Sequence, residues 1–544
     1  MDRIFIIVQT VLASLLFFLY AKTTEKRGLA KPALINDIVN MDINKIDLPL
    51  VNNGRTGNFA NAFYPNGANL HFLFDGGFAV SGYVNNALRV SWMATDAFAR
   101  EWQPGKWGMS PEDSSARFYV VDQSDGFGSQ AYINWADAVT LGAGFQDLDG
   151  NGFYDPFVDK PDILGDRTIW TVFNDGTPDS VRQIGFRTLP MGLEIQQTVW
   201  AFAQSGPLAN VIFFRYRLIN VGTNDVDSLI FSLVTDSDIG DAADDLTGCN
   251  PEFQLGYNYN DGDDFDYGLN PPAFGLQILQ GAIVDSPGDT AFHYRGSFFG
   301  TDTLPDKKNL LMTSYLPYEK NPTPPFSIPV DSLQARFAQI GGLDKFGNPI
   351  DPATWGIGGT ASDDPKFAFS GDPVTGSGWL DNPARDRRQL ISSGPFQLAA
   401  GDTQDIICAY VLGQGNNALE SITVMRQNAR AALAHIGVPV IVGIHENDPP
   451  VSSQFKLYQN YPNPFNPSTS VAYSLSKPAN VTLKIYNLLG QKVKTLIDER
   501  KTAGIHTVRW DGRDAAGESV STGIYLYSLQ IGSFFEVKKM LLMQ

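Results

Sequence analysis

Cysteine and histidine are scarce in this chain of 544 residues, which has 2 Cys and 5 His. The histidines are His71, His293, His435, His445 and His506. They show no HExxH or other paired spacing, which excludes the common zinc-protease pattern. A Gly-x-Ser-x-Gly elbow, a P-loop and a dinucleotide fingerprint are also missing. The sequence therefore carries no catalytic signature, although a carboxylate pair for glycoside hydrolysis is defined in space and stays open.

The two cysteines, Cys249 and Cys408, lie in different surroundings. Cys249 is in an acidic loop, and Cys408 is in the apolar run DIICAYVLG. An exported chain could pair them as a disulfide. The alternative is two separate small side chains, one of them buried.

Positive charge is also in short supply, with 40 Lys and Arg against 58 Asp and Glu. From residue 456 onward there are 11 basic against 6 acidic residues, so the preceding part has 29 against 52. An acidic body of this kind argues against nucleic acid, whose phosphates need a basic footprint. It suits divalent cations or solubility outside the cell.

Long apolar runs are confined to the first residues. The run Ile4–Tyr20 follows Arg3 and precedes the small residue Ala21. This pattern predicts a secretory signal peptide cleaved after Ala21, with an uncleaved membrane anchor as the alternative. We expect the mature chain to be soluble or attached to a surface.

What the sequence has in abundance is the composition of a β-rich protein, with 36 Phe, 20 Tyr, 52 Gly and 33 Pro. Period-two alternation predicts a hairpin of 71–84 with 87–94 and an antiparallel meander over 193–234. Further strands are predicted at 387–398 and 403–413, and long ordered loops at 257–373.

One helix is predicted at Asn417–Ile436. Asn417 is a good N-cap, Glu420 stands three residues later, and Gly437 and Pro439 end the pattern.

The predicted fold is all-β: a large decorated β-sandwich body with one helix near its end, and a small C-terminal Ig-like β-sandwich. The predicted parts are a signal peptide (1–21), an extended segment (22–58), the acidic body (59–437), a linker (438–455) and the C-terminal domain (456–544).

The stretch DLDGNGFYD predicts a Ca²⁺ loop. Its expected ligands are Asp147, Asp149, Asn151, Phe153 through its carbonyl, Asp155 and Asp159. The first five stand at positions 1, 3, 5, 7 and 9 of an EF-hand-like loop, and Gly152 takes the sharp turn at position 6. Position 12 is Val158 instead of Glu, so Asp159 or a distant carboxylate must close the site. The alternative is a turn whose side chains cap their own backbone. No organic cofactor is expected.

A second acidic cluster directly follows a predicted strand. Its members are Asp236, Asp238, Asp241, Asp244 and Asp245. Five carboxylates so close in sequence repel one another unless a cation or solvent intervenes. A second metal site and a solvated acidic loop are both open.

From residue 457 to 544 the chain resembles the type A C-terminal sorting domain of the bacterial type IX secretion system, which is related in shape to the Ig-like module of flagellar hook-capping proteins. Five ordered motifs carry the resemblance: YPNPFNPST, IYNLLGQKV, AGIHTVRWDGRD, STGIYLYSL and the basic ending VKKMLLM. Alternation in this region also predicts about seven short strands. The motif residues are Tyr461, Pro462, Asn463, Pro464, Phe465, Asn466, Pro467, Trp510, Asp511, Gly512, Gly523, Tyr525, Lys538 and Lys539.

The resemblance implies a route to the cell surface or the medium, through the periplasm and an outer-membrane translocon. It implies the type IX translocon as partner, and a sortase-like peptidase that cuts in the linker and attaches the body to surface lipopolysaccharide. The alternating prolines of YPNPFNP predict an extended segment without a strand partner.

The body resembles a group of type IX cargo proteins from Bacteroidota whose activity is uncharacterised. The resemblance rests on GDRTIWTVFNDG, DDLTGC, NPPAFGLQILQG, SGDPVTGSGWL and DRRQLISSGPF. The predicted function is a structural or binding role at the cell surface, with glycans among the candidate partners. The alternative is a secreted hydrolase, for example one that acts on carbohydrate.

Overall fold

The computed structural model describes most of the body and of the C-terminal region. The described residues are 37–58, 60–92, 101–177, 182, 186, 188–296, 298–319, 327–437, 455–457, 460, 465–475, 478–487, 491–502, 504–531 and 534–542. The predicted signal peptide, most of the predicted linker and the motif residues Tyr461, Pro462, Asn463 and Pro464 lie outside them.

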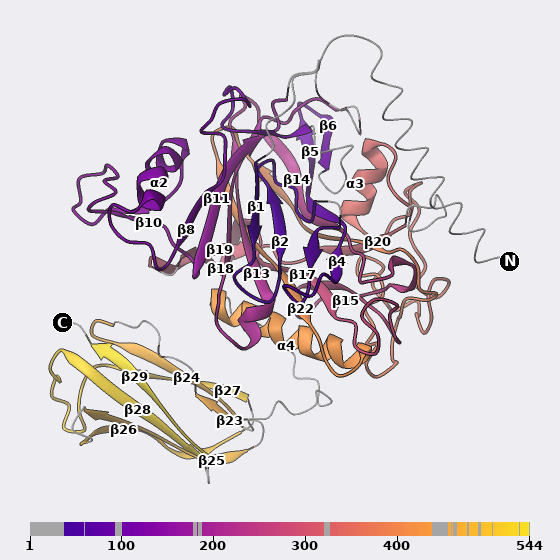
Figure 1. Cartoon of the computed structure of the whole chain (residues 1–544). Coiled ribbons are helices and arrows are strands. Elements are labelled where there is room, and N and C mark those ends of the chain that lie inside the picture. The colour runs from indigo at the N-terminus through magenta and orange to yellow at the C-terminus, as the bar shows by residue number, and fades with distance from the viewer. Residues whose placement is uncertain are drawn as a thin grey trace. The chain divides into compact units, whose positions relative to one another are not determined.

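The chain divides into two compact units, Met1–Val442 and Gly443–Gln544. The first unit is the body, and a nine-stranded antiparallel sheet is its largest element (Figure 1). Its path is β15-β16-β17-β22-β13-β12-β11-β7, and β8 also pairs with β11. The bounds are β7 (Gln103–Pro104), β8 (Tyr119–Asp122), β11 (Arg167–Asn174), β12 (Leu193–Ala201), β13 (Val211–Asn220), β15 (Leu246–Asn250), β16 (Leu255–Tyr259), β17 (Ala273–Gln280) and β22 (Thr403–Gly413).

A five-stranded antiparallel sheet packs against it, with the order β20-β21-β14-β5-β6. The bounds are β5 (Asp75–Val84), β6 (Ala87–Trp92), β14 (Val226–Asp236), β20 (Ser314–Tyr318) and β21 (Arg388–Leu398). Aromatic rings join the two sheets: Phe78 of β5 stacks on Phe173 of β11 at 5.7 Å, and Phe231 of β14 lies 5.0 Å from Tyr216 of β13. The body is therefore a β-sandwich, as predicted.

Side chains of β13 alternate between two cores, as the pleat of a strand requires. Phe214 belongs to the core between the sheets. Its neighbour Phe213 belongs to a second core on the opposite face, where Ile422 and Met425 of helix α4 (Ala418–Ile436) also lie. This helix, which covers part of the outer face of the large sheet, confirms the predicted one, with Asn417 as N-cap and Gly437 as C-cap.

The predicted meander over 193–234 is correct for two of its three strands. β12 and β13 are antiparallel neighbours, but β14 pairs with β5 and β21 in the other sheet. The place beside β13 is taken by β22, which comes much later in the chain. Short turns do not decide which sheet the next strand joins, because apolar strands of this kind fit either layer.

The region 257–373 is more regular than the predicted loops. It supplies β17, an inner strand of the large sheet, and the long ribbon of β18 and β19. It also contains the short helix α3. The remaining body elements are β1 (Ile38–Met41), β2 (Leu48–Val51), β3 (Ala62–Phe63), β4 (His71–Leu73), β9 (Phe145–Gln146), β10 (Lys160–Pro161), β18 (Ile283–Gly296), β19 (Gly300–Asn309), α2 (Gln130–Leu141) and α3 (Ser332–Ile340).

The body begins earlier than the predicted residue 59. Met41, Ile46, Leu48 and Leu50 are buried in the core between the sheets. β1 and β2 form a two-stranded ribbon whose second strand is buried throughout. The described part of the predicted extended segment is therefore part of the body.

The two cysteines are free and buried. Cys249 lies on β15 and Cys408 on β22, with two strands between them in the sheet. The structure thus follows the alternative of two separate side chains, and both are buried.

The C-terminal unit has seven described strands in a three-stranded sheet (β23-β24-β27) and a four-stranded sheet (β26-β25-β28-β29). The bounds are β23 (Phe455–Leu457), β24 (Thr469–Leu475), β25 (Ala479–Asn487), β26 (Lys492–Lys501), β27 (Gly504–Trp510), β28 (Gly523–Ile531) and β29 (Phe534–Leu542). Trp510 is fully buried, and its indole N–H donates to the carbonyl of Arg513. Phe465 is in the same core and forms a parallel bridge with Leu542. The prediction that the segment YPNPFNP has no strand partner is therefore wrong at Phe465.

Among the helices in the described ranges, none combines the length and the hydropathy that a bilayer crossing needs.

Candidate functional site

The predicted Ca²⁺ loop lies between β9 and β10, and three of its carboxylates converge. Asp147, Asp149 and Asp159 offer oxygen atoms that all lie within 4.8 Å of one another. Asp147 and Asp149 are exposed, whereas Asp159 is buried. Carboxylate oxygens are the ligands that Ca²⁺ prefers. The donor set fits the ion, and the calcium site stays a prediction.

The same carboxylates also stabilise the turns of their own loop. Asp147 accepts a backbone N–H from Gly152 at 2.8 Å, which lowers the pKa of Asp147 below its ordinary value. Asp159 accepts the N–H groups of Leu148 at 2.8 Å and Asp155 at 2.9 Å. Such bonds are expected for the alternative, a turn whose side chains cap their own backbone. They are also compatible with calcium binding, because a carboxylate oxygen that accepts one N–H still has a second lone pair for an ion.

Three predicted ligands stand outside this group of carboxylates. The Asn151 amide donates to Asp149 at 2.8 Å, and its oxygen accepts the N–H of Phe153 at 2.7 Å. Asp155 accepts the N–H of Phe157 at 2.9 Å. The side chains of Asn151 and Asp155 thus stabilise the turn itself, whereas the Phe153 side chain is exposed.

The second acidic cluster divides in the fold. Asp236 and Asp238 come within 4.8 Å of Asp386, a residue just before β21 that the sequence did not single out. Arg388 donates to both Asp236 and Asp386 at 2.9 Å. Burial, together with the neighbouring carboxylates, raises the pKa of Asp238 to about 8. The guanidinium and the retained proton lower the negative charge that would attract a metal here.

The other three aspartates of that cluster have separate roles. Asp241 caps the 3₁₀ turn Ala242–Asp244. Asp244 accepts the amide of Asn260 at 2.6 Å, and burial raises its pKa to about 6. Asp245 is fully buried, which raises its pKa well above the ordinary value. The structure does not bring them into the group around Asp238.

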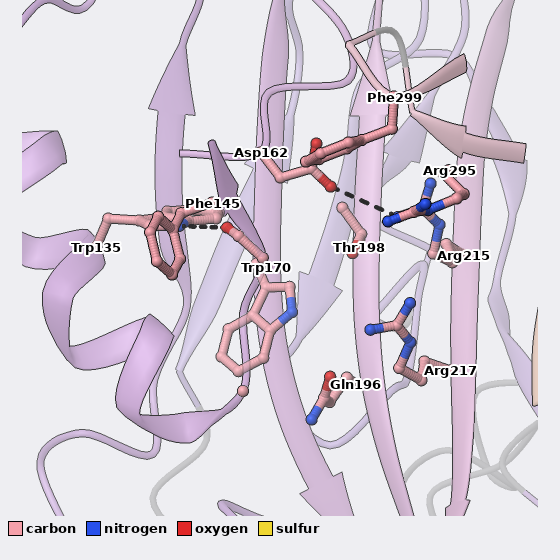
Figure 2. A pocket seen from close by; sticks show the side chains of 12 residues that line it. Trp135, Phe145, Asp162, Trp170, Gln196, Thr198, Arg215, Arg217, Arg295 and Phe299 are labelled. Atoms are coloured by element: carbon pink, nitrogen blue, oxygen red, sulfur yellow. Dashed lines mark hydrogen bonds and ion pairs between the residues drawn. The ribbon is translucent and has the colours of Figure 1, made fainter. Parts of the chain in front are cut away.

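The most chemically distinctive hollow was not predicted. It lies on the outer face of the large sheet, where polar, charged and aromatic side chains line it (Figure 2). We call it the arginine groove, and it consists of two adjoining hollows of about 240 and 640 Å³ that share Gly142, Gln196 and Arg217.

Two cross-strand rows form the floor of the arginine groove. The first row holds Trp170, Thr198 and Arg215, and the second holds Gln196, Arg217 and Asp405. Alternation along β13 places Arg215 and Arg217 on one face of the sheet, while Phe214 and Tyr216 enter the core between the sheets.

Two segments that project from the large sheet form the walls of the arginine groove. One contains α2 and β9, and it brings Trp135 and Phe145 to the first hollow. Gly142 ends α2 with φ +113°, and a Cβ there would collide with Gln196. Only glycine lets the turn approach the floor so closely. The ribbon of β18 and β19 forms the other wall, and it places Arg295 and Phe299 at the first hollow (Figure 2).

Buried carboxylates hold the arginines in place. Arg217 donates to Asp405 in a bidentate pair at 2.8 and 3.0 Å, and His293 Nε2 lies 3.0 Å from the same carboxylate. Burial alone would raise the pKa of Asp405, but the bonds from His293 and Arg217 lower it below the ordinary value. Asp405 is therefore an anion that orients Arg217.

Arg215 is held more loosely. Its guanidinium lies 3.7 Å from Asp162, whose pKa is raised by burial. Within the described residues, Arg215 Nε and Asp162 Oδ1 are buried and have no hydrogen-bond partner. Buried polar atoms are rarely left in this state, so the two atoms call for a ligand or water in the first hollow.

Comparisons with known proteins give little for the body. No curated protein matches the chain. Three solved structures show partial similarity. PorZ, an essential surface component of the type IX secretion system of Porphyromonas gingivalis, is 21% identical over 16% of this chain and 11% of PorZ, with a TM-score of 0.13. A protein described as a polysaccharide lyase is 9% identical over 64% of this chain and 34% of its own (TM-score 0.17), and dimeric latent PorU from P. gingivalis is 11% identical over 69% of this chain and 31% of its own (TM-score 0.15). The chain spans about a third or less of the length of each. At these TM-scores the likeness carries no argument.

The C-terminal unit gives a clearer result. Residues 465–532 match the FlgD Ig-like domain. The match covers five of the seven described strands, β24 to β28, in full. The C-terminal unit therefore contains an Ig-like domain of the FlgD type.

Proposed function

We propose that this chain is an exported protein that binds an anionic ligand in the arginine groove. The observation that carries the proposal is the cluster of guanidinium groups in the first hollow. Arg215, Arg217 and Arg295 line it together. Their carboxylate partners are Asp162 at 3.7 Å, Asp405 at 2.8 Å and Asp302 at 3.4 Å, respectively. Residues 1–455, which include the body, have 29 basic against 52 acidic residues. Each guanidinium group has five N–H donors, more than one carboxylate partner uses, and the remaining donors can bind an anion.

Calorimetric titration of the full chain with dextran sulfate tests this binding, with uncharged dextran as the control ligand. We expect dextran sulfate alone to bind, more weakly as salt rises because exposed charges are screened. Arg217→Gln and Arg295→Gln should each weaken binding about tenfold, since each removes a charge-assisted hydrogen bond. Arg117→Gln is the matched control: the Arg117 side chain is 38% exposed, like that of Arg217, and is paired with Asp137 away from the groove. Equal binding of both polymers would contradict the proposal.

The C-terminal unit is proposed to direct export by the type IX route to the cell surface or the medium. The match to a FlgD Ig-like domain supports this, as do the buried motif residues Phe465 and Trp510. The type IX translocon is the proposed partner, with a sortase-like peptidase and surface lipopolysaccharide as partners after transport. Deletion of residues 456–544 should leave the chain in the periplasm of its host, as measured by cell fractionation. Surface display of the truncated chain would refute this role.

A hydrolase remains the second candidate, because two carboxylates of the groove have opposed pKa shifts. Burial raises the pKa of Asp162, while the contacts of Asp405 lower its pKa. Such a divergence is typical of an acid and base pair. Against it, both oxygens of Asp405 already accept bonds from Arg217. Release of reducing sugar from polysaccharides, lost in Asp162→Asn, would favour the hydrolase. Tight binding without release would favour the binding protein.

A Ca²⁺ ion at Asp147, Asp149 and Asp159 is proposed to stabilise the body. The ion would tie the exposed loop to buried Asp159 and so to β10. Its proposed role is structural, because the loop residues named here do not line the arginine groove.

A further inference from the structure

We infer that the ligand of the arginine groove is an acidic polysaccharide, a chain of sugar rings that carry carboxylates. This inference rests on the proposed binding of anions and adds the chemical class of the ligand. Four features of the groove support it: its two adjoining hollows, the spacing of its cations, its aromatic walls and its neutral polar floor.

The groove offers two adjoining hollows. They share Gly142, Gln196 and Arg217, and the larger is also lined by His293 of β18 and Lys307 of β19. The larger hollow alone, at about 640 Å³, falls within the range of ligand-binding pockets. An extended ligand would occupy both hollows, whereas a free inorganic anion would use a small part of one.

Cationic side chains recur in both hollows. Arg215 and Arg295 line the first hollow, and Arg217 lines both. Lys307, which is paired with exposed Asp285, lines the second. Guanidinium groups match the planar fork of a carboxylate, which they bind in bidentate fashion. Recurrent cations suit a polymer whose negative charge recurs with each unit.

Aromatic rings distinguish a sugar polymer from a simple polyanion. Phe145 and Phe299 flank the first hollow, and Figure 2 shows Phe299 beside Asp162 and Arg295. Phe299 is 40% exposed and its ring lies under the Arg295 guanidinium at 5.1 Å. Apolar ring faces pack on the C–H faces of sugar rings by dispersion and area burial. Polyphosphate has no such face.

The floor offers neutral donors and acceptors for hydroxyl groups. Gln196 and Thr198 lie between the two arginine positions and the β11 side of the groove. Asp162 Oδ1 and Arg215 Nε, which have no partner among the described residues, add an acceptor and a donor. A hydroxylated ring can satisfy both, whereas an anionic group can satisfy only the donor.

Nucleic acid fits less well, although it is also an anionic polymer with flat rings. Binding its phosphates needs a broad basic surface, and the body is strongly acidic outside the groove. An acidic peptide offers carboxylates on flexible side chains without ring faces for Phe299. We therefore commit to the saccharide, and these polymers become controls.

The test is calorimetric titration of the full chain with oligogalacturonate, a neutral gluco-oligosaccharide of equal length, poly-glutamate and polyphosphate. We expect oligogalacturonate to bind at least about tenfold more tightly than each of the others. Phe299→Ala should weaken oligogalacturonate binding about three- to tenfold and leave polyphosphate binding unchanged, because only the sugar packs on the ring. Arg295→Lys should weaken it less than Arg295→Gln, since it keeps the charge and loses the fork.

Matched variants separate these effects from loss of fold. Phe346→Ala removes a phenylalanine that is 66% exposed and does not line the groove, so it should leave all affinities unchanged. Equal affinity for poly-glutamate or polyphosphate, with no effect of Phe299→Ala, would overturn the saccharide and leave anion binding intact. Binding of none of the anions would overturn both proposals.

Discussion

Asp147 and Asp405 both have pKa values below the ordinary range, but for opposite physical reasons. Asp147 is exposed and its anion is favoured by backbone N–H groups of its own loop. Asp405 is 5% exposed, and its anion persists against burial only because His293 and Arg217 donate to it. The first charge depends on a local turn, and the second depends on partners brought from distant strands. Replacement of an exposed carboxylate such as Asp147 should therefore cost little stability by itself, whereas replacement of buried Asp405 should destabilise the residues that it binds.

The largest expected effect on stability comes from replacing the buried carboxylate, Asp405. Asp405→Asn removes the anion between Arg217 and His293, and we expect it to lower the free energy of unfolding by about 2–4 kcal/mol at pH 7, with the lower end favoured by the partial exposure of Arg217. Urea unfolding of the full chain measures the change. The folded pKa of Asp405 is depressed, so its contribution is present above the unfolded value of about 3.9 and is lost as pH falls further. The difference between the two proteins should accordingly shrink below about pH 4.

Asp402→Asn is the control, because Asp402 is exposed one residue before the same strand. It should change stability little. If Asp402→Asn and Asp405→Asn had equal effects, the buried network around Arg217 would not be stabilising.

Asp238 is a half-buried carboxylate whose pKa is raised, unlike that of Asp405, so its replacement should change the free energy of unfolding in the opposite direction. Its pKa is raised to about 8, so the folded chain holds a proton that the unfolded chain releases near pH 4. Stability is therefore lost as pH rises between these values. Asp238→Asn should stabilise the body by roughly 1–3 kcal/mol at pH 8 and by much less at pH 4. Thermal melts at the two pH values check this.

A bound metal would reverse that result. If Ca²⁺ held Asp238, the ion would keep it ionised, and Asp238→Asn would destabilise the protein at pH 8 in the presence of Ca²⁺. This outcome would support the predicted metal site at the second acidic cluster.

We expect the exposed loop of Asp147 to stabilise the folded chain only when it binds Ca²⁺. Chelation is expected to lower the melting temperature of the full chain by a few degrees, because an ion that binds only the folded state stabilises it by mass action. Asp147→Asn should abolish the difference between melts with Ca²⁺ and with chelator. Asp344→Asn is a matched control: Asp344 also accepts local N–H groups, from Phe346 and Asn348 at 2.8 Å, but is not part of a described carboxylate group. An unchanged melt with and without Ca²⁺ would refute the site.

The same contrast explains how much the sequence could predict. The Asp147 loop and helix α4 are visible in sequence because their contacts are local: Asp147 bonds Gly152, and Asn417 bonds Glu420. The arginine groove is not visible in the sequence, because Arg217 and its partner Asp405 are 188 residues apart in the chain. The alternation in RYRLIN does place Arg215 and Arg217 on one face, which was the available signal. Which strand lies beside β13 depends on how apolar faces pack across the whole body.

Helix α2 was missed for a related reason. Its Ser129 cap and Gly142 stop are regular helix signals. Its buried residues include Tyr132 and Trp135, and aromatic residues favour strands by propensity. The second acidic cluster stays a prediction, and the sequence could not supply its third carboxylate: Asp386 is distant in sequence and meets Asp238 through the pairing of β14 with β21.

The smallest expected effect concerns an exposed side chain that bonds only local backbone. Asn417 Oδ1 accepts the N–H of Glu420 at 2.9 Å at the start of α4, and Asn417→Ala should lower the free energy of unfolding by about 1 kcal/mol. The loss is limited because Ile422 and Met425 keep the inner face of the helix buried against the large sheet. Asn417→Asp, which retains an acceptor, should restore most of the stability, while ligand binding in the arginine groove stays unchanged in both variants. A loss as large as that of Asp405→Asn would show that a local cap can matter as much as a buried ion pair, and the contrast between Asp147 and Asp405 would no longer hold.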